Sequence, residues 1–241
     1  MEVIGVIPAR MSSTRFPGKP LVDIGGKSMI RRVYEQAVKS EVLDAVYVAT
    51  DNKEIADEVE SFGGLVQMTA DSHQNGTSRC AELVSNLSTQ PKIVVNIQGD
   101  EPFFNPNDLN TLIACFKQKD VQIASLAKHI EHVDEVEIAT VVKVVFDADK
   151  KALYFSRAPI PFQREASSSV YYKHIGLYAY RTGVLNEIVK LPRSPLERIE
   201  NLEQLRWLEN GYNIHLGFTN HDSNSVDTPE DLAGIIKQYN L

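Results

Sequence analysis

The sequence predicts an α/β fold, with a doubly wound, mostly parallel sheet and a smaller mixed α/β lobe. Up to about residue 100, short apolar runs rich in β-branched residues alternate with amphipathic helical patterns. The runs are apolar throughout, as strands are when helices cover both faces of a parallel sheet. The 241 residues, 43% of them hydrophobic, are enough to bury one large core with a smaller lobe attached.

The predicted elements follow one another in this order. In the first half, we expect strands at 3–8, 45–50, 65–69 and 92–98, separated by helices at 29–39, 55–62 and 79–87. After about residue 140 the pattern changes, and strands at 141–146 and 152–155 flank a polar turn at 147–150. A loop at 158–169, a strand at 174–180, helices at 183–190 and 197–210, a strand at 213–218 and a helix at 229–239 follow. We therefore expect a single domain over residues 1–241 with an inserted lobe at about 130–211.

Charge and composition exclude several classes of protein. The net charge is −7, which is the wrong sign for a protein that lives on a nucleic-acid backbone. Two cysteines, Cys80 and Cys115, are too few for a disulfide framework or a cysteine-rich metal site. The N-terminal apolar run is broken by Pro8, and no stretch approaches the roughly 20 apolar residues that span a bilayer. We expect a soluble cytoplasmic protein with no membrane insertion.

The loop after the first predicted strand is the strongest chemical signal. Between Ala9 and Lys19 it carries the cations Arg10, Arg15 and Lys19, three hydroxyl side chains and a glycine. Ligands of open α/β sheets bind at the carboxyl ends of the strands, and these cations would neutralise phosphate oxygens there. The alternative is a solvated polar loop. A nearby Gly26-Lys27-Ser28 is not a Walker A loop, because Leu21 stands where the first glycine is required.

Two further segments supply carboxylates. The predicted buried strand at 92–98 runs into Gly99-Asp100-Glu101, at the same sheet edge as the cationic loop. Asp227 precedes a helix that Thr228 caps, and so remains available as a second ligand. Mg²⁺ binds carboxylate oxygens together with substrate phosphates. The cationic loop and the Gly99-Asp100-Glu101 segment at the same edge therefore favour a metal–nucleotide site over a simple polar turn.

Later in the chain, His174 and the pair Glu203-Gln204 could recognise a polar ligand, although each taken singly is more often a surface or structural residue. No cysteine and histidine cluster has zinc spacing, and no G-x-S-x-G nucleophile elbow is present. The chemistry that these residues favour therefore needs no protein nucleophile.

With these motifs assembled, the sequence resembles the 3-deoxy-manno-octulosonate cytidylyltransferases, also called CMP-Kdo synthetases, nearly from end to end. The resemblance rests on the segments 7–10, 17–21, 47–51, 96–102, 152–157, 173–178, 202–206 and 226–231. The first segment, which contains Pro-Ala-Arg, is shared with the sialic-acid relatives. Phe155-Ser156-Arg157 and Leu202-Glu203-Gln204-Leu205-Arg206 favour the Kdo branch.

The resemblance implies a nucleotide-diphospho-sugar transferase-like fold and a cytoplasmic homodimer that joins CTP to Kdo for lipopolysaccharide synthesis, releasing pyrophosphate. It implies catalytic roles for Arg10 and Lys19 on the phosphates and for Asp100 and Asp227 on Mg²⁺. It also implies a nucleotide site that includes Ala9, Arg10, Arg15, Lys19, Gly76 and Arg79. The sugar acid would be held by Gln98, Arg157, His174, Tyr178, Glu203 and Gln204, most of them in the inserted lobe.

One segment departs from the family pattern. The family usually has Ser-Gly-Thr, an acid and Arg, whereas this chain has Asn75-Gly76-Thr77-Ser78-Arg79. Ser78 could cap the following helix instead.

A related sugar acid, such as an 8-amino Kdo analogue or a nonulosonate, is the alternative substrate. A nucleotide-binding regulator would not need the metal ligands, and a dinucleotide-binding dehydrogenase would need the G-x-G-x-x-G fingerprint, which is missing after the first strand.

Overall fold

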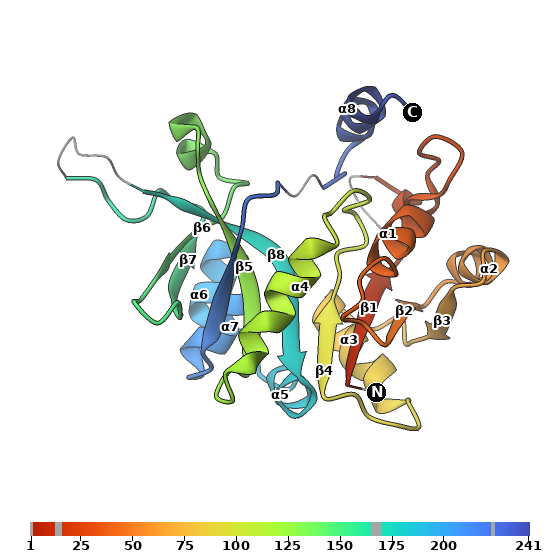
Figure 1. Ribbon diagram of the computed structural model, residues 1–241, viewed down its shortest axis with the longest axis horizontal. Helices are drawn as coiled ribbons and strands as arrows, with labels where there is room; N and C mark the ends of the chain where they lie inside the picture. Colours follow the sequence, from red (N-terminus) through yellow and green to blue (C-terminus); the bar gives the residue numbers. More distant parts are fainter. Residues whose placement is uncertain (1, 13–15, 165–169, 223–224) are drawn as a thin grey trace. The chain divides into compact units, whose positions relative to one another are not determined.

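The structure is a computed structural model that describes residues 2–12, 16–164, 170–222 and 225–241 (Figure 1). The chain forms two compact units. The first unit comprises Met1–Leu109 together with Asp222–Leu241, and the second comprises Asn110–His221. The predicted lobe at 130–211 falls within the second unit.

The first unit is built on parallel strands, as the apolar runs predict. Its strands are β1 (Val3–Ala9), β2 (Ala45–Thr50), β3 (Leu65–Met68) and β4 (Ile93–Asn96). They lie in the order β3-β2-β1-β4, and each neighbouring pair is parallel. The chain therefore moves outward from β1 to β2 and β3, and then crosses back to the other side of β1. Such a reversal makes the carboxyl ends of β1 and β4 the usual place for a ligand.

Helices connect these strands, and polar side chains fix where the helices begin. The helices are α1 (Met29–Ala37), α2 (Lys53–Ser61) and α3 (Gly76–Ser85). Ser28, Asn52 and Asn75 each accept a backbone N–H of the following helix. The predicted start of the third helix at residue 79 is wrong, since Asn75 rather than Ser78 is the N-cap.

The C-terminal helix α8 (Pro229–Tyr239) packs back onto the first unit and ends where the sequence predicts. Val226 and Ile235 form a buried cluster with Ile24 and Met29. The Thr228 side chain caps the helix and Asp231 completes the capping box, as expected. Asp227 is thereby held between a buried residue and a fixed helix start.

The second unit is mixed in strand direction. Its strands are β5 (Ile123–His129), β6 (Lys143–Phe146), β7 (Ala152–Ser156), β8 (Tyr172–Arg181) and β9 (Ile214–Thr219). β5 pairs antiparallel with β8 and parallel with β9, and β6 and β7 form the predicted hairpin. β5 was not among the predicted strands, because its run is interrupted by Ser125 and Lys128, which are both buried.

The remaining helices include two short ones where the sequence predicts a single helix. They are α4 (Asn107–Ala114), α5 (Thr182–Ile188), α6 (Pro195–Glu200), α7 (Gln204–Glu209) and the 3₁₀ turns η1 (Lys19–Leu21), η2 (Cys115–Lys117) and η3 (Val133–Glu137). The single helix predicted at 197–210 is wrong, because Asn201 takes a left-handed conformation, with φ of 52°, and separates α6 from α7. A buried ion pair at 2.6 and 2.8 Å between Glu197 and Arg206 holds the two short helices together.

Among the described residues, no helix has both the length and the apolar character that crossing a bilayer requires.

Candidate active site

A pocket of about 570 Å³ opens in the first unit, beside the ends of β1 and β4. It is lined by Pro8, Ala9, Arg10, Ser12, Lys19, Pro20, His73, Asn75, Gly76, Arg79, Gln98, Gly99, Asp100 and Asp227. The lining comes from loops that follow β1 and β4, from the start of α3 and from the segment before α8. The strand order alone predicts a ligand site at this edge.

Lys19 joins the two carboxylates that the sequence singles out. Its Nζ lies 2.8 Å from Asp100 Oδ2 and 3.3 Å from Asp227 Oδ1. The backbone keeps the two acids together, because the N–H of Val226 donates to the carbonyl oxygen of Asp100 at 2.9 Å. Residues more than a hundred positions apart in the chain thus converge on one cation.

This pair of carboxylates fits a magnesium ion. Their side chains are 29% and 34% exposed, so water and a ligand can reach both. Within the described parts of the chain, no three His, Cys, Asp or Glu side chains gather into a metal cage. Mg²⁺ commonly uses one or two protein carboxylates and completes its shell with waters and substrate phosphates. Asp100 and Asp227 are therefore the residues that would hold it.

Two glycines let the pocket walls approach β1 closely. A Cβ on Gly99 would lie 2.9 Å from the carbonyl oxygen of Pro8, which is backbone and cannot turn away. A Cβ on Gly76 would lie 2.9 Å from Cγ of the same proline. Both positions therefore require glycine, and both place backbone directly at the pocket surface.

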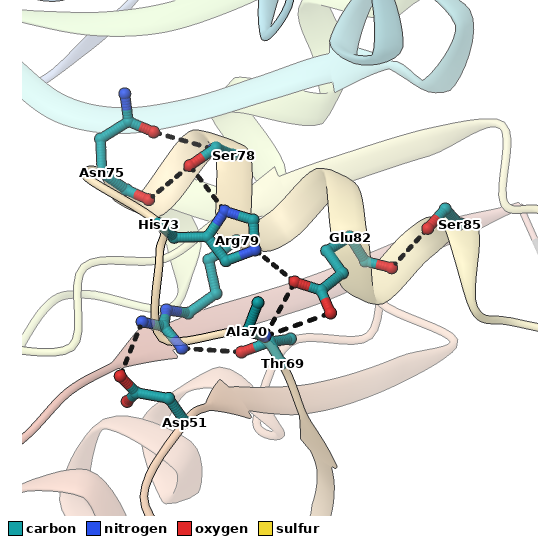
Figure 2. A network of polar contacts seen from close by, with 9 residues as sticks. All are labelled: Asp51, Thr69, Ala70, His73, Asn75, Ser78, Arg79, Glu82 and Ser85. Atoms are coloured by element: carbon teal, nitrogen blue, oxygen red, sulfur yellow. Dashed lines mark hydrogen bonds and ion pairs between the residues drawn. The ribbon is translucent and has the colours of Figure 1, made fainter.

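Arg79 enters the pocket wall from α3 and is almost fully buried, with 3% of it exposed. Its NH1 donates to Thr69 Oγ1 at 2.7 Å, and its NH2 lies 3.4 Å from Asp51 Oδ2 (Figure 2). NH2 makes no hydrogen bond within the part of the chain that the structure describes. The guanidinium is thus held inside the pocket wall by Thr69 and Asp51.

His73 lies next to Arg79 in the same wall and is held from both sides (Figure 2). Its Nδ1 is 3.1 Å from Ser78 Oγ, and its Nε2 contacts a carboxylate oxygen of Glu82. That carboxylate also accepts the N–H of Ala70 at 3.0 and 3.1 Å. The hydrogen bond from His73 lowers the pKa of Glu82 against the opposing effect of burial, and the bond to Ala70 lowers it further. The loop before α3 is therefore tied to the helix through one carboxylate.

The predicted nucleotide and catalytic residues fall together, with one exception. The pocket is lined by all the others, namely Ala9, Arg10, Lys19, Gly76, Arg79, Asp100 and Asp227. Gln98, which was predicted to bind the sugar acid, also lines it. Arg15 lies outside the described residues. His73 and Asp51, which contribute to this wall, are not predicted from the sequence. His73 could have been predicted from its position, because it lies two residues before the N-cap Asn75 of a helix that begins at the ligand-binding edge of the sheet.

The other predicted sugar-binding residues lie in the second unit. His174 and Tyr178 stand in β8 with their ring centroids 5.3 Å apart, and Phe155 packs edge-on against His174 at 5.0 Å. Burial lowers the pKa of His174 from 6.5 to about 3, so its imidazole is neutral at physiological pH. Burial also raises the pKa of Tyr178, and the negative charge of Glu203 adds to this effect.

Glu203, Gln204 and Arg157 surround the break between α6 and α7. Glu203 precedes α7 and Gln204 is its first residue. The side-chain nitrogen of Gln204 is buried and finds no partner among the described residues. The Arg157 guanidinium donates to the carbonyl oxygens of Glu200 at 2.8 Å, Ala139 at 3.1 Å and Asn201 at 3.5 Å. Three of its five N–H groups are thus used on backbone, and the other two have no partner within the described parts of the chain.

The depressed pKa of His174 predicts a pH dependence of stability. Between pH 6.5 and about 3 the unfolded chain binds a proton on this residue and the folded chain does not. The free energy of unfolding should therefore fall as the pH falls below 6.5, by less than about 1.4 kcal/mol per pH unit, because His174 keeps some solvent exposure. Urea unfolding of the wild type and His174→Gln between pH 5 and 7 checks this. An equal slope in both proteins would contradict it.

Comparison with known proteins agrees with this geometry. The family model for cytidylyltransferases matches residues 4–214, so the class of protein is that of the nucleotidyltransferases, for which a sheet edge with cations and a carboxylate pair is a suitable site. The 3-deoxy-manno-octulosonate cytidylyltransferase of Parabacteroides distasonis is 50% identical over 96% of both chains. That of Bacteroides thetaiotaomicron is 51% identical, again over 96% of both chains.

A solved structure of CMP:2-keto-3-deoxy-manno-octonic acid synthetase complexed with CTP superposes with a TM-score of 0.94, at 40% identity and with complete coverage of both chains. The 4-diphosphocytidyl-2C-methyl-D-erythritol synthase of Anaerococcus prevotii, at 13% identity and a TM-score of 0.68, shares the fold. The chain belongs to the family of 3-deoxy-manno-octulosonate cytidylyltransferases, and the resemblance stated from its motifs is confirmed.

Proposed function

We propose that the chain transfers CMP from CTP to 3-deoxy-D-manno-octulosonate (Kdo), giving CMP-Kdo and pyrophosphate for lipopolysaccharide synthesis. The observation that carries this proposal is the convergence of Lys19, Asp100 and Asp227 in a pocket that also contains Arg10. It combines cations for a triphosphate with carboxylates for a metal. The name and the CTP ligand of the similar structure support the choice of nucleotide.

The first unit would bind the nucleotide. Arg10 and Lys19 would neutralise the phosphates, with Arg15 as a further cation of the same loop. Gly76 and Arg79, together with the backbone of Ala9, form a wall that suits a flat base. We expect CTP to be preferred over ATP and GTP on size, and over UTP through hydrogen bonds to the exocyclic amine. Each mismatched buried polar group typically costs about 1–3 kcal/mol.

The reaction is an in-line attack of the anomeric hydroxyl of the sugar acid on the α-phosphorus. Negative charge grows on the phosphoryl oxygens and on the leaving pyrophosphate, so fixed cations contribute most of the catalysis. Mg²⁺ held by Asp100 and Asp227 would supply Lewis-acid charge stabilisation when bound. Lys19 and Arg10 would stabilise the departing pyrophosphate. No protein nucleophile is required.

The second unit would select the sugar acid. Neutral His174 and the carboxylate of Glu203 can accept hydrogen bonds from sugar hydroxyls. The hydroxyl of Tyr178 can donate them, and so can the buried side-chain nitrogen of Gln204, which has no partner among the residues that the structure describes. The two remaining N–H groups of Arg157 suit the carboxylate of the sugar acid.

We also propose that the enzyme is cytoplasmic and homodimeric. Large apolar side chains of the second unit are exposed, among them Leu153 at 61%, Phe162 at 87% and Ile199 at 79%. Exposed apolar surface of this kind is typical of an interface between subunits. Light scattering should give the mass of a dimer, and a monomeric mass at micromolar concentration would contradict this part of the proposal.

The alternative substrate is a related sugar acid, such as an 8-amino Kdo analogue or a nonulosonate. Pyrophosphate release measured with CTP and each acid in turn separates the possibilities. We expect the highest kcat/KM with Kdo. A higher value with another acid would replace Kdo as the substrate, and no release with any acid would refute transferase activity.

Glu203→Ala tests the assignment of the sugar acid to the second unit. Loss of the carboxylate should raise KM for the sugar acid about tenfold or more, since hydrogen bonds to charged groups contribute about 1.5–3 kcal/mol. CTP binding measured by calorimetry should stay within a factor of two. Loss of CTP binding with an unchanged KM for the sugar acid would show that this division of labour is wrong.

A further inference from the structure

The pairing of β5 with β8 contains a bulge beside the candidate sugar residues. Ser125 stands opposite Tyr178, whereas the next residue, Leu126, stands opposite Ile175. Gly176 and Leu177 therefore lie outside the regular register of the two strands. A bulge of this kind re-aims the side chains on either side of it.

The bulge brings two side chains together that a regular strand would separate. Residues four positions apart in a strand are about 13 Å apart along the chain. His174 and Tyr178 have this spacing, yet their ring centroids are only 5.3 Å apart. The local distortion of β8 is thus what allows both side chains to act on one ligand.

The hydroxyl of Ser125 lies at the centre of this arrangement and is fully buried. Its Oγ is 3.0 Å from the carbonyl oxygen of Leu177 and 3.2 Å from that of Ile175, the carbonyls that bracket the bulge. It is also 2.9 Å from Nε2 of His174. One hydroxyl therefore connects the distorted backbone to the imidazole.

The donors and acceptors around Ser125 favour one tautomer of His174. A hydroxyl carries one hydrogen, and carbonyl oxygens can only accept. If Ser125 donates to the bulge carbonyls, its oxygen must accept a hydrogen from Nε2 of His174. In a neutral imidazole the other nitrogen, Nδ1, is then the acceptor. The low pKa of His174 agrees with a neutral ring.

We propose that Ser125 is a positioning residue for sugar-acid recognition, which holds the bulge of β8 and fixes His174 as the Nε2–H tautomer. In this state Nδ1 accepts a hydrogen bond from a hydroxyl of the substrate. The role in recognition rests on the proposed function, whereas the tautomer of His174 does not. The two parts can therefore be tested separately.

The first measurement is the ¹⁵N NMR spectrum of the His174 ring in the free protein, which reports the tautomer directly. Wild type should show protonated Nε2. Ser125→Ala should shift the ring toward the Nδ1–H tautomer or a mixture, and Ser125→Thr, which keeps the hydroxyl, should restore the wild-type signals. Ser125→Cys replaces the hydroxyl with a weak donor of similar shape and serves if the alanine variant does not fold.

The second measurement is steady-state kinetics on the same variants. Ser125→Ala should raise KM for Kdo about tenfold, with KM for CTP unchanged and kcat within about threefold. Thr219→Val is the matched control, since it also removes a buried hydroxyl from the second unit, and it should leave both KM values unchanged.

An unaltered His174 spectrum in Ser125→Ala would overturn the proposal. So would a loss of thermal stability that is accompanied by equal rises in both KM values, since that pattern indicates a purely structural role. A wild-type protein that shows the Nε2–H tautomer but releases no pyrophosphate with Kdo would instead refute the proposed function and leave the tautomer assignment standing.

Discussion

Asp100→Asn and Asp227→Asn should each lower kcat by about three orders of magnitude, corresponding to about 4 kcal/mol of lost transition-state stabilisation. Either change leaves a single carboxylate beside Lys19, where two now lie within 3.3 Å of its Nζ. The metal would lose a charged ligand, and Lys19 would lose a partner that directs it. Kinetics at saturating CTP and Kdo, with excess Mg²⁺, measure the effect.

Asp23→Asn is the control for these variants. Asp23 is an exposed carboxylate of the first unit that accepts the N–H of Gly26 at 3.1 Å, and it does not line the pocket. It should retain wild-type kcat. Activity near wild type in Asp100→Asn or Asp227→Asn, with circular dichroism unchanged, would remove both residues from the catalytic site.

Lys19→Met should lower kcat by a factor of about 10² to 10³, because one fixed donor aimed at developing charge contributes about 2.7–4 kcal/mol. The Lys19 side chain is only 14% exposed. In the variant, a cation from solution therefore cannot easily take the place of the lost ammonium group. In the free protein, the Lys19 ammonium would also compete with a divalent cation for the same two carboxylates. Mn²⁺ binding without nucleotide, followed by electron paramagnetic resonance, should therefore become tighter in Lys19→Met.

Lys27→Met provides the matched control for Lys19→Met. Lys27 belongs to the Gly26-Lys27-Ser28 segment that resembles a Walker A loop, but its Nζ pairs with Glu35 at 2.6 Å. It should keep wild-type activity. A kcat for Lys19→Met within a factor of three of wild type, or weaker Mn²⁺ binding, would contradict the role given to Lys19.

The fold of the first unit could be predicted because its signals are local. Continuous apolar runs mark its buried parallel strands, and Ser28 and Thr228 mark helix starts through contacts three residues away. The second unit was harder, because its features depend on distant partners. The break at Asn201 is supported by the ion pair between Glu197 and Arg206, which no local pattern of a single helix reveals.

The candidate site also combines residues that local sequence marks with residues that only distant contacts reveal. Arg10, Lys19, Asp100 and Asp227 follow strands or precede a helix at one edge, so the sequence alone could place them together. Lys19 contacts Asp100 and Asp227, and Arg10 lines the same pocket, while the catalytic roles of all four stay predictions. Asp51 is not among the residues that line the candidate site, and it contacts Arg79 from the position just after β2, a contact that only the folded chain displays.

The departure at Ser78 has a structural explanation. Because Asn75 caps α3, Ser78 occupies the third helical position, where its N–H is bound by the Asn75 side chain at 2.9 Å. Its hydroxyl contacts His73 and the carbonyl oxygen of Asn75. Ser78 therefore helps to hold His73 in place in the pocket wall.

The most direct test of the central claim is pyrophosphate release from CTP and Kdo by the purified wild-type protein, with Mg²⁺ titrated from zero and with EDTA added. We expect release that depends on all three components, saturates with Mg²⁺ and stops when EDTA is in excess. Release that continues in excess EDTA would contradict the metal role of Asp100 and Asp227. No release at any Mg²⁺ concentration would contradict the proposed reaction itself.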